Sequence, residues 1–236
     1  MTPKLVYVAD PYCSWCYAMK PVVARLAAGE GTGIPLAVQS ISGGMVPEDK
    51  RFASVLQRLG DAVALHERVS AASGVQFGAP YIAKLRDPDA PDMMNSLQPA
   101  RAEKALLMLG AGDPLEVAGA VQDLWFEQGR DLTDPASYRP LCERYGIDFQ
   151  AFAEKFASDE VSYAVRGDLD WVRAAGIQGF PALLLQDGER HYQLLARGFT
   201  PYEDAAPRLA AALRDIAAAG DGAGEGETCA ADGSGC

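Results

Sequence analysis

Apolar and polar residues follow two different patterns in the N-terminal part of the chain. A short apolar run that contains two β-branched valines predicts a buried strand over residues 4–9. Residues 12–28 then carry apolar side chains at helical spacing and are followed by Gly29, which predicts a helix that ends there. Residues 35–41 predict a second strand. Because a strand–helix–strand connection is almost always right-handed, with parallel strands, we expect a parallel pair here.

The middle of the chain has a helical pattern almost throughout. Apolar residues recur there every three or four positions, and glycines or the Asp-Pro pair at residues 87–88 interrupt the pattern. We therefore expect a block of consecutive helices. The predicted helices cover residues 49–72, 96–109, 114–128, 135–144, 148–157 and 159–175.

Strands return in the C-terminal part. Residues 182–185 predict a strand, the Asp-Gly pair at residues 187–188 is a strong hairpin signal, and residues 191–196 predict the returning strand. Residues 202–219 predict a closing helix. Without the helical block, the order of elements is βαβ followed by ββα, which is the order of the thioredoxin fold.

This order predicts an α/β protein in which an all-helical domain is inserted into a thioredoxin fold. Residues 1–46 and 176–219 would form the thioredoxin-like domain, and residues 47–175 the inserted helical domain. Residues 220–236 are rich in Gly and acidic residues and lack apolar periodicity, which predicts a flexible tail.

Charge and composition narrow the classes of function. The net charge is -11, from 32 acidic against 21 basic residues, and no dense Lys/Arg cluster offsets it, so we expect no nucleic-acid binding. No stretch approaches the ~20 apolar residues of a membrane span. Met1 leads almost directly into the first strand, which leaves no room for a signal peptide, and we expect a cytoplasmic protein.

Two cysteines carry the strongest chemical signal. Cys13 and Cys16 are separated by two residues and lie where the first strand ends and the first helix begins. Such thiols can form a reversible disulfide, and the start of a helix favours the thiolate of the first one. A structural disulfide or half of a zinc site is the alternative. A four-cysteine zinc site needs a second close pair, and Cys229 and Cys236 are widely spaced, so we expect no metal.

The chain resembles the DsbA-like thiol–disulfide oxidoreductases over about residues 4–218. Residues 10–16, Asp-Pro-Tyr-Cys-Ser-Trp-Cys, look like the active-site turn of that family, and residues 179–182, Gly-Phe-Pro-Ala, look like its cis-proline loop. The resemblance implies that Cys13 is the exposed nucleophile and Cys16 the resolving thiol. It also implies that Pro181 is cis and faces the thiols, and that the Phe180 backbone pairs with an extended substrate peptide.

The two residues inside the motif indicate a branch of the family. Ser14 and Trp15 stand where strongly oxidising members carry a histidine, so we expect a less oxidising couple, similar to the cytoplasmic FrnE-like branch. We expect Ser14 to lie at the substrate site and Trp15 to border the groove. Kappa-class glutathione transferases and 2-hydroxychromene-2-carboxylate isomerases share the architecture. They usually carry serine at the position of Cys13 and lack the second thiol.

We therefore expect a dithiol–disulfide oxidoreductase or isomerase that acts on thiol- or disulfide-containing proteins or peptides. A cellular thiol would be the reductant, no cofactor would be tightly bound, and glutathione could serve as co-substrate. A homodimer is compatible with the sequence. A glutathione-dependent isomerase or transferase of a small aromatic compound and a redox-sensing or metal-binding module stay open as alternatives.

The remaining thiols and imidazoles have simpler interpretations. Cys142 is predicted to be a buried small hydrophobic residue, and the histidines, His66 and His191, to be structural or surface residues. Cys229 and Cys236 form a candidate secondary redox pair that could exchange electrons with the active site or with a neighbouring subunit. A dispensable tail or a loose metal chelator explains them equally well.

Overall fold

A four-stranded sheet forms the centre of the protein in the computed structural model, which describes residues 2–222. Its strand order is β2-β1-β5-β6. Strand β1 (Lys4–Ala9) pairs parallel with β2 (Ala37–Ser42) and antiparallel with β5 (Ala182–Gln186), and β5 pairs antiparallel with β6 (Tyr192–Arg197). The predicted parallel pair and the predicted C-terminal hairpin are both confirmed.

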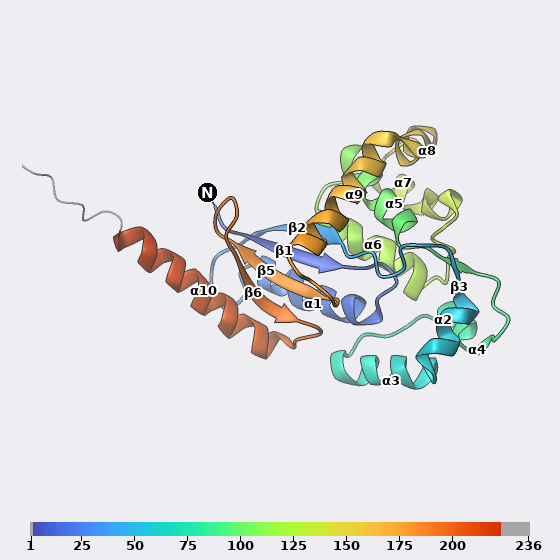
Figure 1. The fold of residues 1–236 in the computed structure, drawn as a ribbon, viewed down its shortest axis with the longest axis horizontal. Helices are drawn as coiled ribbons and strands as arrows, with labels where there is room; N and C mark the ends of the chain where they lie inside the picture. Colours follow the sequence, from blue (N-terminus) through green and yellow to red (C-terminus); the bar gives the residue numbers. More distant parts are fainter. Residues whose placement is uncertain (1, 223–236) are drawn as a thin grey trace, which may run out of the picture.

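Helices cover both faces of this sheet (Figure 1). Helices α1 (Ser14–Ala27) and α10 (Tyr202–Gly222) pack on one face, and α9 (Asp159–Ala174) packs on the other. Strand β1 faces both layers because successive side chains of a strand point to opposite sides. Leu5 and Tyr7 join the cluster with α1 and α10, whereas Val6 and Val8 join the cluster with α9.

The chain between β2 and β5 is mostly helical, as predicted. In Figure 1, α2, α3 and α4 lie together beside the start of α1, and α5 to α9 form a second group against the β2 edge of the sheet. The elements are β3 (Lys50–Arg51), α2 (Phe52–Leu59), α3 (Ala62–Ser73), α4 (Ala79–Arg86), β4 (Met93–Met94), α5 (Leu97–Met108), α6 (Pro114–Phe126), the 3₁₀ helix η1 (Pro135–Tyr138), α7 (Arg139–Tyr145), α8 (Phe149–Ala157) and α9.

The prediction of one helix over residues 49–72 is wrong. Gly60 adopts a φ of +71°, which ends α2, and the Asp61 carboxylate accepts a hydrogen bond from the Ala64 N–H at 2.9 Å and caps α3. The chain before Phe52 pairs with β4 instead of starting a helix. Helix α4 and the β3–β4 ribbon were not predicted.

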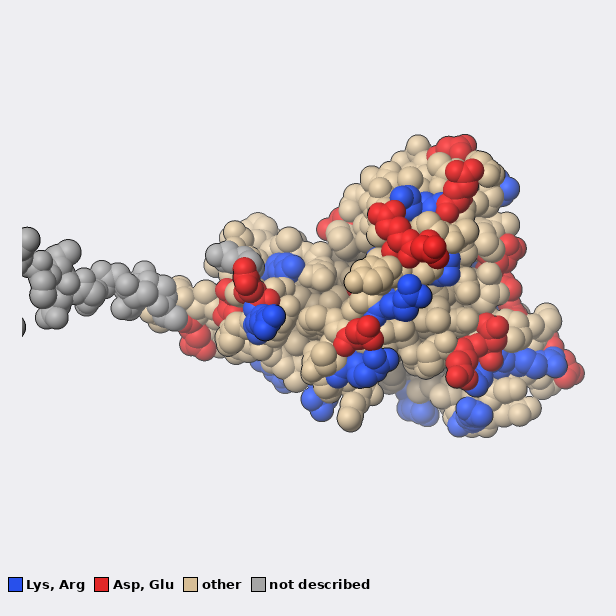
Figure 2. All heavy atoms as spheres, turned by 45° about the horizontal axis from the view of Figure 1, so that its top comes forward, with Lys and Arg blue, Asp and Glu red and all other residues tan. Residues whose placement is uncertain are grey.

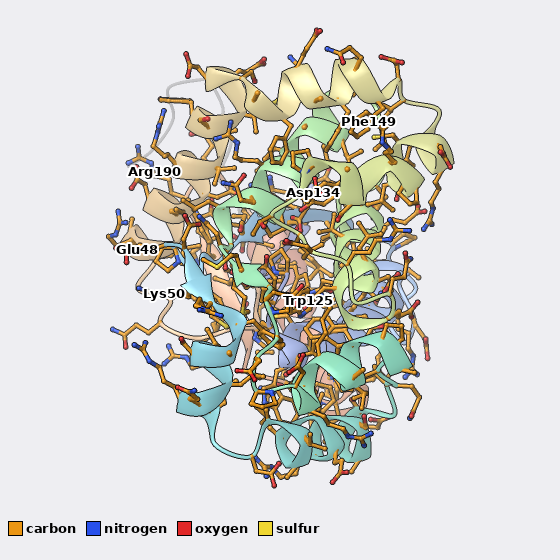
Figure 3. All side chains as sticks on the ribbon, turned by 90° about the vertical axis from the view of Figure 1, so that its right-hand side faces the viewer. Glu48, Lys50, Trp125, Asp134, Phe149 and Arg190 are labelled. Carbon is orange, nitrogen blue, oxygen red and sulfur yellow. The ribbon has the colours of Figure 1, made fainter. Side chains whose placement is uncertain are left out.

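The aromatic core of the helical block reaches the start of α1. Trp125 of α6 is fully buried, and its ring makes edge contacts with Tyr12 and Phe52, with 5.1 Å between ring centroids in each case. In Figure 3, Trp125 lies in the interior, whereas Glu48 and Lys50 stand at the outer edge. Because Tyr12 directly precedes Cys13, this core fixes the turn that carries Cys13.

The surface carries mixed charges. In Figure 2, Lys and Arg alternate with Asp and Glu over the visible face. Within residues 2–222, no helix is long and apolar enough to cross a membrane.

Candidate active site

Cys13 is the N-cap of α1. Its N–H donates to the Asp10 carbonyl at 3.0 Å, which closes the turn after β1, and its sulfur accepts a hydrogen bond from the Cys16 N–H at 3.2 Å. Unpaired N–H groups and the helix dipole stabilise negative charge at this position. The sequence therefore places the Cys13 sulfur where a thiolate is favourable.

The two thiols differ in their surroundings. Cys16 lies one turn into α1 and is completely buried, and burial raises the pKa of its thiol well above the ordinary value, with a further increase from the nearby Cys13. Cys13 is 7% exposed. The expectation of an exposed nucleophile is therefore wrong: Cys13 is buried, and it lines two cavities, one with residues of α9 and the loop before β5 and one with residues of α2, α3 and α4. Both thiols are free.

The loop before β5 faces Cys13. The Phe180–Pro181 peptide bond is cis, and the Cys13 S–H donates to the Phe180 carbonyl at 3.8 Å. The Pro181 carbonyl accepts from the Gly198 N–H at 2.7 Å, which anchors this loop to the end of β6. The structure thus brings together two segments that lie 167 residues apart in the sequence.

An open groove of about 550 Å³ runs past Cys13 on this side. Its lining includes Gly43 and Gly44, residues 177–180, and Arg173 of α9. A Cβ at Gly43 would stand 2.4 Å from the Phe180 ring, so only glycine allows this close approach.

On its other side, Cys13 lines a smaller cavity of about 160 Å³. Ser14 and Trp15, the residues inside the motif, both line this cavity and not the groove beside Phe180. The Trp15 ring is half-buried and packs on Phe199 at 5.7 Å between centroids.

The comparisons with known proteins agree with this geometry. Residues 4–210 match the model of the DSBA-like thioredoxin domain. The chain belongs to this family. No curated protein matches the sequence significantly.

Solved structures with the same fold include disulfide oxidoreductases. A protein disulfide isomerase candidate from Nitrosomonas europaea is 23% identical, with a TM-score of 0.76 over 91% of this chain and 99% of that one. The cytosolic disulfide reductase DsbM from Pseudomonas aeruginosa, in its complex with GSH, is 25% identical, with a TM-score of 0.70 over 89% and 99% of the chains. A 2-hydroxychromene-2-carboxylate isomerase is 13% identical, with a TM-score of 0.57 over 94% and 99%.

Two buried carboxyl groups lie behind the active-site turn of this DSBA-like domain. Asp10 is fully buried and accepts hydrogen bonds from the Tyr12 N–H at 3.0 Å and the Met45 N–H at 2.7 Å. Burial raises the pKa of Asp10 above its usual value. The pKa of Glu103 on α5 is raised to about 8, mainly by burial and in part by the nearby Asp10.

Sequence reasoning missed both of these groups as part of the site. Asp10 stands in the recognised motif, and an Asp directly before Pro11 is a usable signal. Glu103 carries no comparable signal, because its helix is far away along the chain and only the packing of α5 brings it near Asp10.

The other sequence-predicted residues divide into two groups. Pro181 and Phe180 lie at the site with Cys13, and Cys142 is buried on α7, as predicted. His66 is buried and hydrogen-bonded, but it also lines the cavity next to Cys13. Cys229 and Cys236 lie outside the described residues, and their redox role stays a prediction.

Within residues 2–222, no group of three or more His, Cys, Asp or Glu residues is arranged to hold a metal ion.

Proposed function

We propose that this chain is a dithiol–disulfide oxidoreductase that reduces or isomerises disulfides through Cys13 and Cys16. The observation that carries the proposal is the placement of the Cys13 sulfur. It caps α1, accepts a hydrogen bond from the Cys16 N–H at 3.2 Å, and donates to the Phe180 carbonyl at 3.8 Å beside an open groove.

The reaction begins with the Cys13 thiolate. It attacks one sulfur of a substrate disulfide, a new bond forms between Cys13 and that sulfur, and the other substrate sulfur leaves as a thiolate that takes up a proton. Cys16 then loses its proton and attacks the Cys13 sulfur. This step releases the second substrate thiol and leaves the Cys13–Cys16 disulfide in the enzyme.

The environment of Cys16 favours this order. Its burial raises its thiol pKa, so Cys16 stays protonated until the mixed disulfide has removed the neighbouring Cys13 thiolate. Two molecules of an external thiol then reduce the Cys13–Cys16 disulfide, and they are themselves oxidised to one disulfide. Glutathione is our proposed reductant, supported by the GSH complex of DsbM, and the cytoplasm is the compartment that would supply it.

The groove supports binding of an extended chain. The open backbone beside Phe180 can pair with a substrate backbone in the manner of an added strand. Ser14, Trp15 and Pro181 would contact the same substrate around the nucleophile. A homodimer and electron exchange through Cys229 and Cys236 stay proposals that the described residues do not bear on.

Reduction of insulin disulfides with glutathione as the reductant tests the proposed function. We expect Cys13→Ser to lower the rate by at least about 100-fold, and Cys16→Ser to accumulate a covalent mixed disulfide visible by mass spectrometry. Cys142→Ala is the matched control: it removes a buried thiol on α7 and should leave the rate unchanged. Full activity of Cys13→Ser would contradict the proposal.

A second candidate has one observation in its favour. The apolar cavity beside Cys13 could hold a small aromatic compound, and the isomerase fold is the same. In that case glutathione would supply the reacting thiol, and Cys13→Ser would retain a glutathione-dependent activity on aromatic compounds. The presence of both thiols makes this candidate the weaker one.

A further inference from the structure

The smaller cavity beside Cys13 has no role in the steps above. Helices α2, α3 and α4 enclose it against the active-site turn, and Cys13 is one of its lining residues. The same sulfur lines the open groove on the Phe180 side. A substrate bonded to Cys13 therefore has two spaces next to its sulfur, one on each side.

The cavity is apolar. Its walls include the buried side chains of Phe52, Tyr81 and Trp125, and no Asp, Glu, Lys or Arg of the described chain lines it. His66 is the one lining group of residues 2–222 that could become positively charged. Its environment therefore decides whether the cavity carries a positive charge.

Burial favours the neutral form of His66, and its hydrogen bonds fix which ring nitrogen carries the proton. Its Nδ1 lies 2.7 Å from the Ala62 carbonyl, which can only accept, so Nδ1 carries the proton. Nε2 then accepts from the Tyr81 hydroxyl at 2.8 Å. Burial lowers the pKa of His66. Both imidazole nitrogens of His66 and the Tyr81 hydroxyl hydrogen are thus already hydrogen-bonded within the protein.

The cavity opens to solvent beside apolar residues. Among the described residues, six large hydrophobic side chains are exposed, and two of them, Met45 at 41% and Leu59 at 50%, line this cavity. Met45 also lines the groove. An apolar side chain of a peptide bound in the groove would therefore contact Met45 on its way into the cavity.

The volume sets the size of the occupant. A dry apolar cavity of roughly 150 Å³ holds one benzene molecule. At about 160 Å³, this cavity fits a single aromatic ring or a branched aliphatic side chain. Glutathione carries no such side chain beside its cysteine, so it would leave the cavity empty.

We propose that this cavity is a specificity pocket for one apolar side chain, aromatic or branched aliphatic, next to the disulfide-bonded cysteine of a peptide substrate. The inference rests on the proposed function, because the pocket selects substrates only if Cys13 attacks their disulfides. The groove then holds the substrate backbone, and the pocket selects among sequences.

The test uses peptides joined to glutathione by a mixed disulfide. One peptide has Phe on both sides of its cysteine, and the other has Gly on both sides, so that the result does not depend on chain direction. We expect kcat/KM of the wild-type protein to be about 10- to 100-fold higher for the Phe peptide, which is the range for burying one such side chain.

Two variants assign the preference to the cavity. Val55 of α2 lines the cavity, and Val55→Phe should fill it and reduce the preference to within about threefold. Gln57→Phe adds the same ring on the exposed side of α2 and should keep the wild-type preference. Where Val55→Phe fails to fold, Val55→Ala enlarges the cavity instead, and the preference should shift from Phe towards a peptide with Trp at both positions.

The outcomes separate the two proposals. Equal turnover of the Phe and Gly peptides by the wild-type protein overturns the pocket and leaves the proposed function intact. If the wild-type protein reduces neither peptide, the proposed function fails, and the pocket assignment fails with it. If the mixed disulfide of glutathione with benzyl mercaptan reacts as well as the Phe peptide, the cavity selects small aromatic thiols, and the peptide assignment is wrong.

Discussion

The groove and the pocket on either side of Cys13 differ in size and in the residues that line them. The groove is open, holds about 550 Å³, and is lined by Gly43 and Gly44 together with larger residues such as Leu169, Val172 and Ile177. The pocket holds about 160 Å³ and is bordered by aromatic and aliphatic side chains of the helical block. Backbone contacts are available to any peptide, whereas a side-chain pocket distinguishes sequences. Under the proposed function, the groove accepts many peptide sequences and the pocket selects among them.

A buried carboxyl group holds Met45, which, like Cys13, lines both spaces. The Met45 N–H donates to the Asp10 carboxylate. Asp10 in turn lies close enough to Glu103 to contribute to the raised pKa of the Glu103 carboxyl group. Met45 lines both the groove and the pocket. Substitutions of these carboxyl groups therefore test whether their ionisation affects the position of Met45 and, through it, the shape of the two spaces.

The largest expected effect concerns stability and Glu103. Its folded-state pKa of about 8 lies above the ordinary 4.5, so the folded state holds the proton more tightly than the unfolded state. The resulting penalty is absent below the unfolded pKa, grows as the pH rises between these two values, and is complete above the folded pKa. Glu103→Gln removes the penalty and should raise the free energy of unfolding at about pH 9 by on the order of 2–4 kcal/mol.

Urea unfolding of the wild-type protein and Glu103→Gln at about pH 5 and about pH 9 measures this effect. The difference between the two proteins should be small at the lower pH. An equal difference at both values would contradict the raised pKa. An unchanged Phe-to-Gly peptide preference in Glu103→Gln would show that ionisation of Glu103 affects the stability of the fold and not the selectivity.

Gly43→Ala should weaken the groove without touching the pocket. The new methyl group would lie within 2.4–2.7 Å of the Phe180 ring, which must move and disturb the carbonyl opposite Cys13. We expect kcat/KM to fall by about 10-fold for the Phe and Gly peptides alike, since an overpacked contact costs roughly 1–3 kcal/mol.

Gly167→Ala on α9 is the matched control for this change. A Cβ at Gly167 meets no atom within 4 Å, so activity should be unchanged. A loss in Gly43→Ala that is confined to the Phe peptide would mean that the groove and the pocket do not act separately.

The smallest effect is expected for Arg173, which borders the groove but not the pocket. Its guanidinium pairs with Asp170 at 2.7 Å and is largely exposed, so its interaction with a glutathione carboxylate would be weak. Arg173→Ala should raise the KM for glutathione about threefold. Arg173→Lys should restore most of the loss, and a change in peptide preference would count against the division between groove and pocket.

Local sequence patterns predicted much of the fold. The apolar run of β1, the helical spacing of α1 and the Asp187-Gly188 turn each reflect contacts within a few residues of one another. The break between α2 and α3 was also present in the sequence, as Gly60 followed by the capping Asp61. It was missed because the apolar spacing continues across it.

The active site was predicted only in part. Cys13 and Cys16 form a local motif, and the resemblance identified Phe180 and Pro181 opposite them. The burial of Cys13 was mispredicted, because it depends on helices and a loop that are distant in the sequence. The pocket could not be predicted for the same reason: its walls come from the active-site turn, from α2 to α4 and from Trp125 on α6.

The sequence by itself thus determined the chemistry, since a Cys-x-x-Cys pair at the start of a helix depends on spacing that a short segment carries alone. Tertiary structure decided which surfaces meet that chemistry. It placed Phe180 on one side of Cys13 and the apolar walls around Phe52 on the other, and it brought Glu103 near Asp10. The physical reason is that packing between distant segments sets burial, cavity shape and pKa, and no local pattern records it.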